Sequence, residues 1–120
     1  MAVSVKAVRS GQVLRVKPLR RWFGLSQEEF ARALGVGRAT VVRWEATTGG
    51  PLSHTAEGKL VRALIEIKSL ATKAFGHQAK TWFHDQMPAL NGKTAHAALI
   101  TRGPVPVLMV LRANWDGGYL

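Results

Sequence analysis

The sequence predicts an all-α fold, because helical signals recur along most of the chain and strand-like alternation is sustained nowhere. In several segments apolar residues return every three or four positions, as on one face of a helix. Glycine, proline and small polar residues separate these segments, as expected of turns. We expect roughly seven helices, arranged as an N-terminal helical bundle over residues 1–54 followed by a small helical domain over residues 55–120.

Length and composition restrict the class of protein. The chain has 120 residues, of which 47% are hydrophobic, so it forms one domain or two very small ones that share a core. No apolar run approaches the roughly 20 residues of a membrane span, and "MAVSVKAVRSG" lacks the apolar stretch of a signal peptide. The absence of cysteine excludes disulfides and thiolate metal sites. We therefore expect a cytoplasmic protein.

Positive charge indicates the class of partner. The chain carries 17 Lys and Arg against 7 Asp and Glu, for a net charge of +10. Residues 1–50 hold nine basic and three acidic side chains, which leaves +6 in that half. Such an excess attracts phosphate backbones or acidic proteins, although a generally cationic domain would show the same number.

Two short helices are expected over residues 26–45. The stretch "SQEEFARAL" opens with Ser26, and Glu29 completes a capping box, in which each side chain satisfies the other's backbone amide. "GVG" interrupts at 35–37, and "RATVVRWE" then continues with Val41 and Trp44 on one face. Two short helices joined by a glycine-containing turn are the sequence form of a helix-turn-helix.

The remaining elements follow in order. "TTGGPLSHT" over 47–55 is expected to be a loop, and "AEGKLVRALIEIKSLATKAFG" one long helix that stops at Gly76. Val61 and Ile65 give this helix a second apolar edge, which indicates deep burial or a partner subunit. "AHAALITRG" follows a turn at "PALNGKT", and a final helix begins with Pro104 in its first turn.

The second short helix carries side chains that are suited to contacts with bases in the DNA major groove. Arg38 and Arg43 can donate to guanine or to phosphates, Thr40 can contact a base edge or a thymine methyl, and Ala39 permits close approach. Gln27, in the first turn of the preceding helix, is expected to hold a phosphate together with the helix N-terminus. For Arg43 a phosphate contact or a solvated position stays open beside base reading.

With those residues, "GLSQEEFARALGVGRATVVRWE" resembles the Xre/Cro/C1 helix-turn-helix family. The departure from the family pattern is Phe30, where leucine is usual. Six residues match packing positions of the family: Leu25, Ala31, Leu34, Val36, Val41 and Trp44. Glu45 matches its frequent acidic residue at the end of the second helix.

The second half is similar to the toxin-binding domain of Xre-type antitoxins, the MbcA/ParS-like group. The resemblance extends over about residues 20–120. The matching positions are Phe75, Gly76, Ala79, Trp82, Pro88, Ala89, Leu90, Gly92, Lys93, Thr94, Thr101, Gly103, Val107, Leu111 and Gly117. The chain departs from the pattern at Ala95, where proline is usual, by one residue missing before Gly103, and at Ala113, where arginine is usual.

The resemblance implies a partner and a mechanism. Antitoxins of this family pair with RES-domain toxins that degrade NAD⁺, and their C-terminal segment covers the toxin's NAD⁺ pocket. Trp115 and Tyr119 would then occupy the space of a nicotinamide or adenine ring. Asp116 and the carboxylate of Leu120 would meet arginines that hold the pyrophosphate. Gly117 and Gly118 would let the backbone enter the narrow opening of that pocket.

Alternatives remain open at this point. A stand-alone Xre/Cro-like dimeric repressor would have a C-terminal segment dispensable for every partner, and an adaptor without DNA binding would bury the basic helix. For the C-terminal segment itself, the alternative is that Trp115 folds back onto its own core and Tyr119 is disordered. We expect a homodimer that binds a palindromic operator, and no membrane or small-molecule substrate.

"NGKT" lacks the first glycine and the preceding strand of a P-loop, and the four histidines have no metal-ligand spacing. No catalytic constellation is present, so we expect no enzyme and no cofactor.

Overall fold

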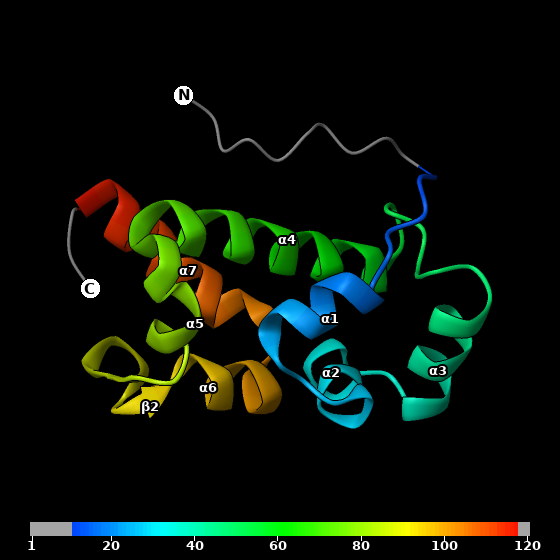
Figure 1. Cartoon of the computed structure of the whole chain (residues 1–120), viewed down its shortest axis with the longest axis horizontal. Helices are drawn as coiled ribbons and strands as arrows, with labels where there is room; N and C mark the ends of the chain where they lie inside the picture. Colours follow the sequence, from blue (N-terminus) through cyan, green and yellow to red (C-terminus); the bar gives the residue numbers. More distant parts are fainter. Residues whose placement is uncertain (1–10, 118–120) are drawn as a thin grey trace.

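The computed structural model describes the backbone of residues 11–117 and the side chains of residues 11–113. Helices dominate this part of the chain, as predicted (Figure 1). Along the chain the α-helices are α1 (Lys17–Phe23), α2 (Gln27–Leu34), α3 (Arg38–Ala46), α4 (Ala56–Phe75), α5 (Ala79–Trp82), α6 (Ala95–Arg102) and α7 (Pro104–Gly117). Two 3₁₀ turns, η1 (Gly76–Gln78) and η2 (Pro88–Leu90), and two short strands, β1 (Gln86–Met87) and β2 (Lys93–Thr94), complete the described elements.

Helix α1 was not predicted, although its boundary signals are present. Pro18 lies in its first turn, and Gly24 ends it in the left-handed conformation with φ 69°. Leu19 and Phe23, one helical turn apart, point into the core. The helix has only seven residues, too few for the apolar repeat to stand out.

The segment before α1 is fastened to the loop between α3 and α4. The Leu14 amide donates to the Pro51 carbonyl at 2.9 Å, and the Val16 amide donates to the Gly49 carbonyl at 2.8 Å. Gly50 permits this approach, because a Cβ there would lie 1.7 Å from the Leu14 carbonyl oxygen. The predicted loop over 47–55 is therefore a paired segment rather than a free surface connection.

Helix α4 forms the spine of the molecule, and α7 packs along it (Figure 1). Val61, Leu64 and Ile67 of α4 are fully buried, whereas Ile65, on the second apolar edge, is only partly buried. Most of the apolar face of this helix is thus buried within the same chain. A partner subunit is not needed to explain the fully buried residues.

The two halves share one core among the described residues. Helix α2 packs against α6 and also touches α4, so the helical pair at the N-terminus rests on the second half. Phe30, the residue that departs from the family pattern, is fully buried in this core. The division at residues 54 and 55 stays a prediction, because a shared core does not by itself define separate units.

A small antiparallel pair corrects one expectation. We expected no strand before "NGKT", but β1 precedes it and pairs with β2, with Gln86 opposite Thr94 and Met87 opposite Lys93. Asn91 and Gly92 turn the chain between them, with φ 57° and 78°. Each strand has two residues, too few for a period-two pattern to be visible in the sequence. The segment is a hairpin turn, as its Asn-Gly pair favours.

Two aromatic residues at family-matching positions, Phe75 and Trp82, are in contact. The rings of Phe75 and Trp82 stack with centroids 5.1 Å apart, and Trp82 is buried while Phe75 is half-buried. Within the described part of the chain, no helix has the length and apolar character needed to cross a bilayer.

Candidate functional site

The turn between α2 and α3 is built as the sequence predicts. Ser26 Oγ accepts a hydrogen bond from the Glu29 amide at 3.1 Å, and Glu29 Oε1 accepts one from the Ser26 amide at 2.9 Å, so the capping box is confirmed. Gly35 ends α2 with φ 68°, which allows the sharp bend. Helix α3 begins at Arg38, and the two helices pack on each other.

The inner face of this helical pair is apolar and closed. Five of the six residues at family packing positions are buried: Leu25, Ala31, Leu34, Val41 and Trp44. Val36 is partly buried and packs against the same core. Burial of this face fixes the rotation of α3, and with it the residues that face outward.

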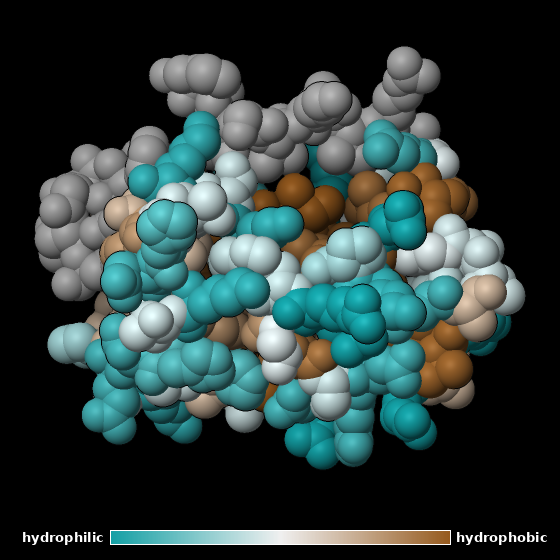
Figure 2. Space-filling view, in the orientation of Figure 1, coloured by the Kyte–Doolittle hydropathy of each residue, from teal (hydrophilic) through white to brown (hydrophobic). Residues whose placement is uncertain are grey.

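The outer face of α3 carries the predicted DNA-binding residues. Arg38, Ala39 and Arg43 are exposed, and Thr40 is half-buried. Neither arginine side chain has a hydrogen bond or ion pair with any residue that the structure describes. Val42 adds an apolar side chain that is 39% exposed, and Figure 2 shows hydrophobic surface at the end of the molecule where α3 lies. This face thus offers two unpaired cations and short side chains together.

A groove runs beside α3. It has a volume of about 370 Å³ and lies between α3 and the start of α4, with Thr40 and Arg43 on one wall and Leu52 and Thr55 on the other. Glu57, the acidic residue among those that line it, lies in the first turn of α4. Thr40 and Arg43 therefore share a surface with the loop that joins the two helices.

Glu45 organises the helix-turn-helix from its buried side. Its carboxylate accepts hydrogen bonds from Arg20 Nε at 2.7 Å and Arg20 Nη2 at 3.0 Å, and from Gln27 Nε2 at 3.2 Å. Arg20 also donates through Nη1 to the Leu25 carbonyl at 3.0 Å. The Glu45 side chain is only 7% exposed. One carboxylate thereby connects α1, α2 and α3.

The environment of Glu45 favours its charged form. The hydrogen bonds from Arg20 lower the pKa of the Glu45 carboxyl, partial burial opposes this effect, and the Gln27 bond with the charges of Arg20 and Lys17 lowers it further. The net direction is a pKa below the usual glutamate value. Glu45 is therefore ionised near neutral pH.

Gln27 was expected to hold a phosphate, and the structure shows where its side chain lies. It is the first residue of α2, half-buried, and its side-chain amide donates to Glu45. Contact of Gln27 with a phosphate stays a prediction. Arg20 was missed as an organising residue, because an arginine in an unpredicted helix has no sequence spacing that links it to Glu45, 25 residues away.

The predicted partner-binding segment lies at the end of α7. The backbone of Trp115, Asp116 and Gly117 continues this helix to its end. The side chains of residues 114–117 are not described, and Gly118, Tyr119 and Leu120 lie outside the described residues. Upstream on the same helix, Val105 and Met109 are 52% and 59% exposed. The contacts predicted for residues 115–120 stay predictions.

Comparison with known proteins identifies the helical pair. Residues 4–62 match the family model of the antitoxin Xre-like helix-turn-helix domain. The N-terminal half of the chain is thus an antitoxin Xre-like helix-turn-helix domain. The match includes α1, α2, α3 and the start of α4, so Arg20 and Glu45 lie inside the matched region.

A solved structure has a related fold. The chain is similar to a chain in the crystal structure of the M. tuberculosis MbcT-MbcA toxin-antitoxin complex, with a TM-score of 0.56 and 18% sequence identity. The similarity extends over 88% of this chain and 94% of the other, so it includes the helices that follow the helix-turn-helix. No curated protein matches the sequence at a significant level.

Proposed function

We propose that this antitoxin binds operator DNA through α2 and α3 and neutralises a RES-domain toxin that degrades NAD⁺. The observation that carries the DNA-binding half is the outer face of α3, where Arg38 and Arg43 stand without partners among the described residues beside Ala39 and Thr40. A cationic helix of this kind suits the major groove, with its N-terminal residues nearest the base edges.

Gln27 completes this surface in two ways. Its place at the start of α2 suits a phosphate contact, in which the helix N-terminus adds its dipole. Its bond to Glu45 fixes the side chain, so little conformational freedom is lost when DNA binds. Two copies of the chain in a homodimer would place two α3 helices on a palindromic operator.

The toxin-neutralising half rests on the family of the N-terminal domain and on the likeness of fold to a chain from a toxin-antitoxin complex. In this proposal the end of α7 and the residues after it cover the toxin's NAD⁺ pocket. Trp115 and Tyr119 take the place of the ring systems, while Asp116 and the Leu120 carboxylate meet cationic groups. Gly117 and Gly118 reduce the width of the backbone at the mouth. The chain itself performs no catalysis and requires no cofactor.

The first test is recovery of partners by the tagged chain from its native host. We expect the full-length chain to retain a RES-domain protein and a promoter DNA fragment. A version truncated after Ala113 keeps the buried residues Val107 and Leu111 and should retain the DNA while losing the protein. Recovery of DNA alone by both versions would contradict the toxin-binding half and leave a stand-alone repressor.

A further inference from the structure

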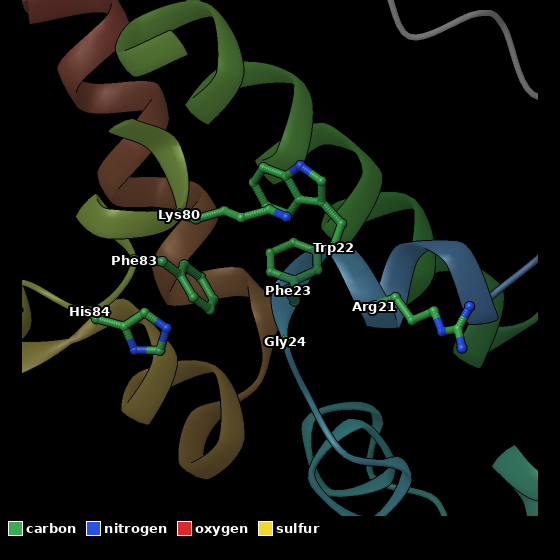
Figure 3. A pocket seen from close by; sticks show the side chains of 7 residues that line it. All are labelled: Arg21, Trp22, Phe23, Gly24, Lys80, Phe83 and His84. Atoms are coloured by element: carbon green, nitrogen blue, oxygen red, sulfur yellow. The ribbon is translucent and has the colours of Figure 1, made fainter. Parts of the chain in front are cut away.

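A hollow lies between α1 and α5, and no residue of α2 or α3 lines it. The hollow has a volume of about 140 Å³. Trp22 and Phe23 of α1 and Phe83, which follows α5, form its walls, and Lys80 of α5 and His84 lie at its edge. Figure 3 shows Lys80 extending from α5 toward Trp22 across the hollow, whereas Arg21 points away from it.

The size of the hollow restricts what it can receive. Cofactors and drug-sized ligands occupy pockets of roughly 300–1,000 Å³. A cavity of about 150 Å³ accommodates a group the size of benzene. A hollow of about 140 Å³ therefore fits one side chain or one small anion, and not a nucleotide.

The charge around the hollow selects an anionic group. None of the residues that line it is acidic. Lys80 has no hydrogen bond or ion pair with the described residues, and a second ammonium, Lys68 Nζ, lies 5.8 Å from the centre of the Trp22 ring. The His84 ring lies beside that of His96, tilted by 35° with centroids 4.9 Å apart. An incoming carboxylate meets donors there without a competing anion from the lining.

The walls favour an anion carried on a side chain. Phe23 and Phe83 are buried with ring centroids 5.2 Å apart, so these walls of the hollow are apolar. The methylene groups of a glutamate or aspartate gain from contact with such walls, and a bare phosphate does not. We propose that this hollow receives an acidic side chain from the antitoxin's protein partner, held by Lys80 Nζ. The identity of that partner as the toxin rests on the proposed function.

The position of the hollow gives the contact a consequence. An occupant would touch α1, which is tied to α3 through Arg20 and Glu45, and α5, which packs on α4 in the second half. The toxin would thus bind to the antitoxin at a point distinct from the end of α7, and on the helix that braces the DNA-binding pair. Loss of this contact weakens toxin binding and leaves the DNA-reading residues of α3 intact.

The test compares Lys80→Gln and Lys80→Arg with Lys73→Gln, an exposed lysine of α4 that does not line the hollow. The Kd for the copurified toxin is measured at several salt concentrations with the full-length chain. We expect Lys80→Gln to weaken binding about tenfold and to reduce its salt dependence. Lys80→Arg should stay close to wild type, and Lys73→Gln should be unchanged. Equal affinities of Lys80→Gln and Lys73→Gln would overturn the inference.

Two further readouts separate this inference from the proposed function. Acetate titrated into the ¹⁵N-labelled chain should shift the Trp22 indole signal saturably, and Lys80→Gln should abolish that shift; a shift absent from wild type would overturn the site. If Lys80→Gln instead weakens operator DNA binding, the hollow holds a phosphate of nucleic acid and the assignment to a protein is wrong. Failure of the proposed function appears differently, as a wild-type chain that recovers no toxin.

Discussion

At the scale of single residues, Glu45 connects the first three helices through its carboxylate. A carboxylate that is 7% exposed is stable there only because Arg20 and Gln27 supply three hydrogen bonds to it. Removing one member leaves the others buried with unmet hydrogen-bonding needs, which costs more than the bond itself. Arg20, Gln27 and Glu45 together therefore position α3 relative to α1 and α2.

The pH dependence of stability should report on Glu45. Because folding lowers its pKa, its contribution is present in full above the ordinary glutamate range and is lost as the pH falls through the folded value. We expect Glu45→Gln to reduce the free energy of unfolding by about 2 kcal/mol at neutral pH, and the difference from wild type to shrink toward about pH 3. Urea denaturation at both pH values measures it.

The matched control is Glu28→Gln. Glu28 pairs with Arg32 at 3.2 Å one turn along α2, but both side chains are more than 60% exposed. Such a pair contributes less than about 0.5 kcal/mol. A Glu45→Gln variant as mildly affected as Glu28→Gln would show that the hydrogen bonds to Glu45 do not hold the helices together.

Arg38 and Arg43 are the residues whose loss should most affect DNA binding. Replacement of either by alanine removes no internal bond among the described residues, so stability should stay near wild type. A base-reading arginine contributes about 1–3 kcal/mol and its loss relaxes specificity, whereas loss of a phosphate contact lowers the salt slope by about one. Fluorescence anisotropy with operator and scrambled DNA distinguishes the two roles, and unchanged affinity for both variants would favour an adaptor that does not bind DNA.

At the scale of elements, packing of the α3–α4 loop depends on a close backbone approach that sequence patterns do not reveal. Gly58 lies in the first turn of α4, and a Cβ there would lie 2.0 Å from the Leu52 carbonyl oxygen. In an exposed helix, alanine would be about 1 kcal/mol better than glycine. At Gly58 the clash of an added Cβ with the backbone decides whether alanine stabilises or destabilises the protein.

We expect Gly58→Ala to destabilise the chain by about 2 kcal/mol or more, with a fall in Tm of several degrees. Gly37→Ala is the control, because a Cβ there meets nothing within 4 Å and its φ is −78°. Thermal unfolding followed by circular dichroism compares the two. A Gly58→Ala protein as stable as Gly37→Ala would mean that the loop moves aside at little cost.

The elements also show what sequence could and could not predict. The capping box at Ser26, the turn at Gly35, the burial of Trp44 and the start of α7 at Pro104 were predicted, because each rests on local chemistry or helical repeats. Helix α1 and the pair β1–β2 were missed because they are too short for periodicity. The Arg20–Glu45 bond, and the approach of His84 to His96, depend on packing between distant segments that no local pattern contains.

At the scale of the whole molecule, one shared core joins the helix-turn-helix to the helices that follow it in the described part of the chain. Helix α2 packs on α6, and α4 packs on α7, so packed helices connect α7 to the helix-turn-helix. In the proposed function a toxin at the end of α7 and an operator at α3 would bind to this one body, and any effect of one on the affinity for the other would be reciprocal. The sign of this coupling depends on how many copies the toxin brings together.

The most direct test of the central claim is NAD⁺ consumption by the copurified RES-domain protein, with increasing amounts of the chain. We predict that one full-length chain per toxin active site reduces the rate below about a tenth, because the segment after Ala113 covers the pocket. The version truncated after Ala113, at the same ratio, should leave the rate near that of toxin alone. Undiminished NAD⁺ consumption with excess full-length chain that still binds operator DNA would contradict the account and leave this protein a repressor only.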